Sequence, residues 1–144
     1  MEKKIFEDDV FYSINWSRPN QCDRHTVMGI PSVAGIVALF QKRNDIIEYL
    51  LFYACWKSGV RSGVRDLLDP TFSQFRELIT LSENKDLMFN FTVVDTSPQD
   101  MQDIMYWLIK EYSPKLNNIK DFLDSERYKN IYLLEKFEGD ADDK

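Results

Sequence analysis

The chain has 144 residues, of which 44% are hydrophobic and 14% aromatic, with only five glycines and five prolines. This length suits one domain with a real core, which excludes a wholly disordered or low-complexity protein. The formal net charge of −6 lacks the basic surplus typical of a protein whose main task is to clamp duplex DNA. Acids outnumber bases mainly at the two ends, which leaves room for a local basic patch in the middle.

Cysteine usage and hydropathy predict a cytoplasmic protein with no membrane partner. Cys22 and Cys55 are too few for a disulfide framework, and no apolar secretory segment precedes them. No stretch approaches the roughly 20 apolar residues that span a bilayer. Cys22 and His25 have the spacing of half a zinc site, but His25 is the only histidine, so we predict no metal site there.

The first half of the chain predicts an arm followed by a hairpin. Residues 1–32 keep no clean period, and we expect an extended, irregular arm with room for one strand. Residues 33–40 (VAGIVALF) and 46–55 (IIEYLLFYAC) are nearly continuous apolar runs separated by QKRND. Such runs predict two antiparallel strands joined by a hairpin loop and covered on both faces.

Helical periodicity begins after the second run. Apolar residues recur at helical spacing over 58–69, where Gly63 costs the helix about 1 kcal/mol relative to alanine and Pro70 ends it. Thr71 is the expected N-cap of a second helix that runs to about residue 81.

The last third predicts one more strand and then helices. Residues 87–94 (LMFNFTVV) are the expected third strand. Ser97 and Pro98 offer a cap followed by proline in the first turn of a helix that ends before Pro114. Residues 119–137 suggest one or two amphipathic helices, and the acidic residues 139–144 a disordered tail.

This order of elements lacks the regular alternation of strand and helix that marks a parallel sheet. We therefore predict an α+β protein with a small three-stranded mixed sheet flanked by helices and a C-terminal helical extension. The expected division is an N-terminal arm (1–32), a core domain (33–118), the helical extension (119–138) and the tail (139–144).

Within residues 33–118, two apolar strands, the second ending in a tyrosine and two small residues, are followed eight residues after that tyrosine by an arginine in a helix. This arrangement resembles the GIY-YIG nuclease family. The segment 35–37 (GIV) stands where the family has Gly-Ile-Tyr, and 53–55 (YAC) where it has Tyr-Ile-Gly or Tyr-Val-Gly. The segment 108–117 (LIKEYSPKLN) is similar to the family's closing motif. The resemblance implies a GIY-YIG-like fold.

The resemblance also implies a one-metal phosphodiester hydrolase, in which a tyrosine helps to activate water, an arginine steadies the phosphate charge and a glutamate holds a divalent cation. Tyr53, Arg61 and Asn117 match and are the candidate catalytic residues, in vestigial form. The metal-binding glutamate falls at Met105, whose thioether does not suit Mg²⁺. The resemblance thus implies a retained fold without the metal, and no cofactor.

Three further residues, Trp56, Lys57 and Arg65, are candidates for a face toward a substrate or partner. Arg61 and Arg65 lie four residues apart, with Lys57 one turn earlier. This basic stripe either meets phosphate or is a solvated face paired with acids such as Asp66.

The sequence therefore favours a non-catalytic GIY-YIG-like module that binds a protein or nucleic-acid partner through the old cleft face. Two alternatives stay open. One is a divergent endonuclease that takes its Mg²⁺ ligand from an unaligned acid and hydrolyses DNA. The other is a small acidic regulatory or interaction protein with no nucleic-acid role.

Overall fold

The computed structural model describes residues 1–56, 59–71, 73–83 and 86–138. Its elements in chain order are β1 (Glu2–Phe6), β2 (Asp9–Trp16), β3 (Asn20–Gln21), α1 (Arg24–Met28), β4 (Gly35–Arg43), β5 (Ile46–Cys55), α2 (Gly59–Leu67), α3 (Arg76–Glu83), β6 (Leu87–Val93), α4 (Pro98–Tyr112), the 3₁₀ turn η1 (Ile119–Asp121) and β7 (Asn130–Phe137).

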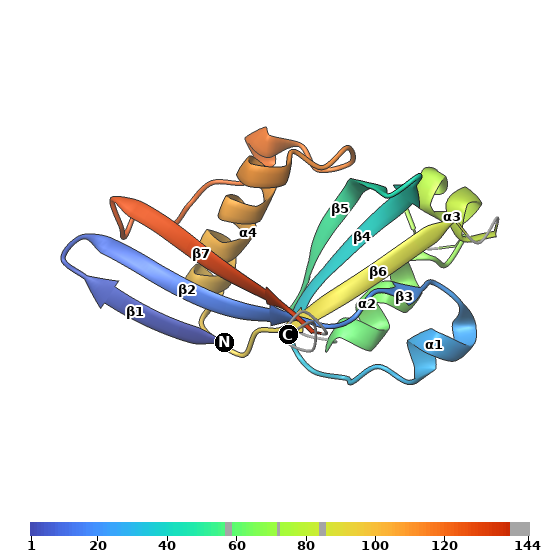
Figure 1. The fold of residues 1–144 in the computed structure, drawn as a ribbon, viewed down its shortest axis with the longest axis horizontal. Helices are drawn as coiled ribbons and strands as arrows, with labels where there is room; N and C mark the ends of the chain where they lie inside the picture. Colours follow the sequence, from blue (N-terminus) through green and yellow to red (C-terminus); the bar gives the residue numbers. More distant parts are fainter. Residues whose placement is uncertain (57–58, 72, 84–85, 139–144) are drawn as a thin grey trace.

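The seven strands found in the described residues form one sheet in the order β1-β2-β6-β4-β5, with β3 added to β6 and β7 added to β2. Paired strands are antiparallel except β2 and β7, which run parallel. β2 and β6 meet through the pair Trp16 and Thr92. From this narrow junction the halves β4–β5–β6 and β1–β2–β7 diverge, with α4 in the angle between them (Figure 1).

The predicted hairpin is confirmed as β4 and β5. Asn44 and Asp45 form its two-residue turn, and both have positive φ, 48° and 68°. This is the turn geometry that matches the twist of antiparallel strands, and asparagine and aspartate tolerate it better than most residues. The strands expected over 46–55 and 87–94 are likewise confirmed, as β5 and β6.

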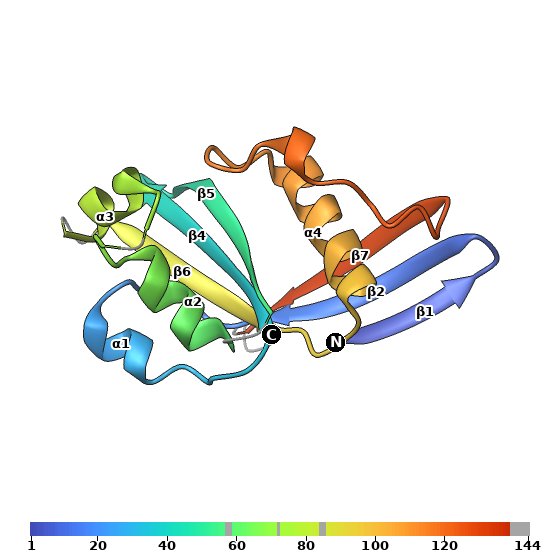
Figure 2. The same ribbon diagram turned by 180° about the vertical axis from the view of Figure 1, so that it is seen from behind.

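Helices cover both faces of the β4–β5–β6 half (Figure 2). On one face α1, α2 and α3 enclose an apolar core that includes Val27, Val37, Leu39, Val60, Val64, Leu78 and Phe89. On the other face α4 packs against both halves of the sheet, in a second core that includes Tyr12, Ile14, Ile36, Phe52, Met105 and Leu108. The β4–β5–β6 half of the sheet is therefore a middle layer between α1–α3 and α4.

The helices predicted over 58–69, after Thr71 and after Ser97 are confirmed as α2, α3 and α4, and α3 starts late. Ser97 caps α4 by accepting the Asp100 N–H, with proline in the first turn, as the sequence predicts. α3 begins at Arg76 rather than after a cap at Thr71. Asp69 Oδ1 accepts the Thr71 N–H at 2.8 Å and Ser73 Oγ accepts a main-chain N–H two residues on. Such local side-chain bonds compete with helix formation.

The prediction of a small three-stranded sheet with a C-terminal helical extension is wrong. Seven strands are found in the described ranges, and residues 119–138 contain η1 and β7 in place of helices. Partly buried and exposed side chains alternate along β7, which is the period of a strand with one covered face. The strand forms because it pairs in parallel with the distant β2, and a short segment does not reveal such pairing.

The expected N-terminal arm is also better ordered than its sequence indicates. Residues 1–32 contain β1, β2, β3 and α1. In β2 the inward residues are buried against α4, while Phe11 lies on the outer face and stacks on Tyr132 with ring centroids 4.8 Å apart. This outward aromatic hides the alternation that marks a strand.

An ionic cluster ties the β1–β2–β7 half to α4. Asp100, 4% exposed, lies in the first turn of α4. Its carboxylate accepts hydrogen bonds from Lys3 Nζ at 2.8 Å, Tyr12 OH at 2.7 Å and Arg127 Nη2 at 2.9 Å. Burial raises the pKa of Asp100, but the hydrogen bonds from these groups and from Thr96 outweigh it, so the pKa lies well below its ordinary value.

The acidic tail predicted over 139–144 and the candidate residue Lys57 lie outside the described residues. Within the described ranges, no helix has both the length and the apolar character needed to cross a membrane.

Candidate functional site

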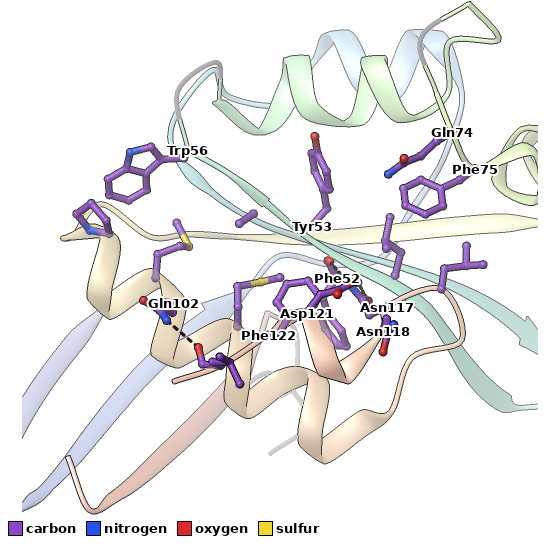
Figure 3. A pocket seen from close by; sticks show the side chains of 17 residues that line it. Phe52, Tyr53, Trp56, Gln74, Phe75, Gln102, Asn117, Asn118, Asp121 and Phe122 are labelled. Carbon is purple, nitrogen blue, oxygen red and sulfur yellow. Dashed lines mark hydrogen bonds between the residues drawn. The ribbon is translucent and has the colours of Figure 1, made fainter. Parts of the chain in front are cut away.

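A groove of about 850 Å³ runs along the outer edge of β5 (Figure 3). β5 ends the strand order of the sheet, so one of its edges has no neighbouring strand among the described residues. One wall carries Tyr53, Trp56, Gln74 and Phe75 from β5 and the α2–α3 layer, and the other carries Met101, Gln102, Met105, Asp121 and Phe122 from α4 and η1. The groove thus lies between the two helical layers.

The side chain of Asn117 closes one end of this edge. Its Oδ1 accepts the Phe52 N–H at 2.8 Å and its Nδ2 donates to the Phe52 C=O at 3.0 Å. Just before it, Leu116 donates its N–H to the Leu50 C=O at 2.8 Å. The segment before η1 therefore covers the β5 edge up to Phe52.

Ala54 is the next residue whose backbone faces outward. In an antiparallel pair, inward-facing and outward-facing backbone groups alternate along the strand. Because the Phe52 groups face Asn117, away from β4, those of Ala54 two residues on face the same way, into the groove that Ala54 lines. The covering of the edge stops one such position short of the end of β5.

Two aromatic residues predicted as site residues stand at this end of the groove. Tyr53 and Trp56 are each 37% exposed. Tyr53 points toward α2, while Trp56 lies beyond the end of β5 (Figure 3). Burial raises the pKa of the Tyr53 hydroxyl, and nearby Cys55 and Asp66 add to the shift, so this group is a weaker general base candidate than a free tyrosine at neutral pH.

The opposite wall is apolar and polarizable. Met105, where the family resemblance places a metal-binding glutamate, is 4% exposed and packs in the α4 core beside Met101. The Gln102 amide donates to the Leu123 and Asp124 carbonyls at 2.8 and 3.1 Å. Among the described residues that line the groove, Asp121 is the only one with a charge.

Arg61, the third predicted catalytic residue, lies in a different cavity. It lines a space of about 990 Å³ between α1, α2 and the end of α3, together with Arg65. Its Nε donates to the Ile30 C=O at 2.8 Å. Tyr53 and Asn117 line the β5 groove and not this cavity. The structure therefore brings two of the three predicted catalytic residues together and leaves the arginine apart.

The cavity that holds the two arginines is mixed in charge. Asp23, Asp69 and Glu83 line it as well. The Arg65 side chain is 67% exposed, with Nε 3.8 Å from an Asp66 carboxylate oxygen. This matches the alternative in which the basic stripe is a solvated face paired with acids.

The described part of the chain holds no group of three or more His, Cys, Asp or Glu side chains that could share a metal ion. Cys22 is buried, and burial raises the pKa of its thiol far above the ordinary value, which disfavours the thiolate that binds metals.

Four residues of the groove could not be identified from the sequence. Ala54 gives the groove its open backbone position, and Met101, Asp121 and Phe122 form the wall opposite Tyr53. Ala54 is a small residue between larger ones in a strand. Such a pattern indicates a binding position only weakly, because it depends on the strand lying at the edge of the sheet.

No curated protein and no solved structure matches the chain. A family model described as "Uncharacterised protein" matches residues 1–141, which include every described element and the whole groove. The resemblance to GIY-YIG nucleases stays a prediction. The chain belongs to the uncharacterised protein family that this model defines.

Proposed function

We propose that this protein is a non-catalytic binding module for a protein partner and that the groove along β5 is its binding face. The observation that carries the proposal is an apolar groove of about 850 Å³ at a strand edge that is covered only in part. Concave sites with apolar walls, exposed aromatics and a few fixed polar groups are typical of binding sites.

The placement of the candidate catalytic residues supports binding over hydrolysis. Arg61 lies in another cavity and donates to the Ile30 carbonyl. The Asn117 amide is engaged by both backbone groups of Phe52. Met105 offers a thioether where a hydrolase of the predicted type needs a hard oxygen ligand. A phosphodiester in the groove would therefore meet Tyr53 without the arginine that should stabilise its charge.

The chemistry of the lining supports a protein partner over a nucleic acid. The described residues of the groove include neither lysine nor arginine, and Asp121 adds a negative charge. Phosphate backbones are bound chiefly by lysine and arginine, so a nucleic acid would be repelled here.

Selection from a displayed library of random linear peptides tests this proposal, followed by binding of the purified peptides measured by fluorescence anisotropy. We expect Trp56→Ala to weaken binding at least about tenfold, because exposed aromatics at such sites carry much of the affinity. Tyr132→Ala is the matched control: this aromatic is 46% exposed on β7, outside the groove, and its loss should leave affinity unchanged.

Four results would overturn the proposal. The library could yield no binder, or binders that ignore Trp56→Ala. A labelled DNA or RNA could bind with a steep salt dependence instead. Nicking of a supercoiled plasmid with Mg²⁺ or Mn²⁺ that disappears in Arg61→Ala and Tyr53→Phe would establish the endonuclease alternative.

A further inference from the structure

We infer that the groove takes an extended peptide segment that pairs with β5 at Ala54 and presents a large apolar side chain close to a basic residue. This inference rests on the proposed function and specifies the chemistry of the partner.

The first argument is the state of the β5 edge. Backbone groups of Lys115 and Leu116 and the side chain of Asn117 bond to β5 from Tyr49 to Phe52. No described residue pairs with the outward N–H and C=O of Ala54. An exposed strand edge of this kind accepts an added strand through backbone hydrogen bonds.

Asn117 shows that the geometry of the edge suits such pairing. Its amide makes the same two bonds to Phe52, of 2.8 and 3.0 Å, that a residue of an added strand would make. A peptide that begins beyond Asn117 continues the same row of bonds at Ala54. The covered positions limit it to a short segment.

The side chains of an added strand alternate between the two walls. A residue directly opposite Ala54 has its side chain on the same face as Ala54, which packs against the α4 core. That side chain therefore points toward Met101, Met105 and Phe122. Because Ala54 is small and methionines adapt their shape, this wall accommodates a large aliphatic or aromatic side chain.

The residues before and after this central position face the other wall. There Tyr53 points toward α2 and Phe75 lies beside the groove (Figure 3). The two walls together favour a segment in which consecutive residues have apolar character, with the largest side chain at the central position.

Charge selects among such segments. Asp121 is exposed on η1 and is the only charged residue among the described residues of the lining. A lysine or arginine of the bound peptide, at the peptide end that lies near Asn117, can pair with the Asp121 carboxylate. An acidic or phosphorylated residue at the same position is repelled. The net charge of −6 acts in the same direction at long range.

The backbone pairing is tested by Ala54→Pro in peptide binding. Proline removes the outward N–H and leaves the bonds to β4, which Tyr53 and Cys55 make. With peptides selected on the native protein, we expect a loss of about tenfold or more, while Ala54→Ser, which keeps the N–H, stays within about twofold. Should proline unfold the chain, replacing the central amide of the peptide with an ester removes the matching peptide N–H and should weaken binding similarly.

The charge selection is tested by Asp121→Asn. We expect this variant to lose affinity for the selected peptides about fivefold and to lose most of the salt dependence of binding, in line with a partly exposed ion pair. Asn118→Asp, which adds a negative charge next to η1, should instead raise the affinity for the selected peptides and make binding more dependent on salt.

The outcomes separate this inference from the proposed function. Peptides that need Trp56 but bind equally to Ala54→Pro and Asp121→Asn would overturn the inference and leave the binding function standing. The absence of any groove-dependent peptide would overturn both. Light scattering could also show that the native protein is a dimer and that Ala54→Pro is a monomer. A second copy of the chain would then fill the β5 edge, and this too would overturn the inference.

Discussion

The side-chain amide of Asn117 bonds to the backbone of Phe52 as a neighbouring strand would, through Oδ1 at 2.8 Å and Nδ2 at 3.0 Å. Unpaired strand edges invite aggregation, and folded proteins commonly cover them. This cover extends to Phe52 and leaves the backbone groups of Ala54 facing the groove. The same residue that the GIY-YIG resemblance places in a catalytic site here performs a structural task.

Asn117→Ala should therefore lower the free energy of unfolding by about 1–3 kcal/mol, because the two backbone groups of Phe52 lose their partners. Asn117→Asp keeps an acceptor for the N–H but faces the carbonyl with a second acceptor, and should be comparably destabilised. Urea unfolding monitored by tryptophan fluorescence measures both. Unchanged stability in both variants would contradict the role of Asn117 as an edge cover.

Gly63→Ala tests the contact between α2 and β5. A Cβ on Gly63 would overlap Cys55 Sγ and lie 3.3 Å from Cys55 Cβ, so the helix or the thiol must move. Despite the higher helix propensity of alanine, we expect a loss of about 1–3 kcal/mol in unfolding free energy from overpacking.

The double variant Gly63→Ala with Cys55→Ala provides the control. It removes the thiol that the new methyl group meets, so most of the loss should be recovered relative to Cys55→Ala alone. If the two substitutions instead have additive effects on the unfolding free energy, the contact with Cys55 is not the reason that position 63 needs a glycine. The thiol itself should react slowly with alkylating reagents in the folded state, since burial raises the pKa of Cys55 to about 12.

Asp100 should make stability sensitive to acid. Its pKa is lowered in the folded state, so the unfolded chain, in which an aspartate titrates near about 3.9, takes up the proton first. The stabilisation from Asp100 is therefore complete above about pH 5 and is lost as the pH falls through 4 and below.

Asp100→Asn should cost about 1.5–3 kcal/mol at pH 7, because Lys3 loses its carboxylate partner and Arg127 keeps only Asp103. It should also make the decline in unfolding free energy between pH 7 and 3 shallower than in the native protein. Glu2→Gln, at an exposed position, is the control that should keep the native profile. An equally steep decline in Asp100→Asn would contradict the assignment.

Arg61→Ala should lower the free energy of unfolding and leave any nuclease activity unchanged. Its Nε–H bond to the Ile30 carbonyl fixes the segment after α1, and its loss should cost about 1 kcal/mol. Arg61→Lys, which can still donate to the carbonyl, should recover part of this. If any plasmid nicking is present, it should be the same in both variants, and its selective loss in Arg61→Ala would contradict this placement.

Local patterns were sufficient for the parts of the fold that local interactions determine. The hairpin of β4 and β5 follows from two apolar runs around Asn44 and Asp45, and α4 follows from its Ser97 cap and Pro98. β7 was missed because its partner β2 lies far away in the sequence. The long-range pairing of a short segment leaves no local signature that separates it from a helix.

The candidate site likewise combines residues that the sequence could identify with features that depend on the whole topology. The sequence singled out Tyr53, Trp56 and Asn117, and these three line one groove. It placed Arg61 with them by resemblance, but the side chain bonds to the segment after α1 and lies in another cavity. The open position at Ala54 depends on which strand ends the sheet, and that is a property of the whole topology.

The measurement that most directly tests the account is amide hydrogen exchange at Phe52 and Ala54, followed by NMR. In the free protein we expect a protected Phe52 N–H, bonded to Asn117, and a rapidly exchanging Ala54 N–H; a selected peptide should then protect Ala54. An Ala54 amide that is already as protected as Phe52 in the free protein, or that gains no protection when the peptide binds, would contradict the central claim that this edge is open and receives an added strand.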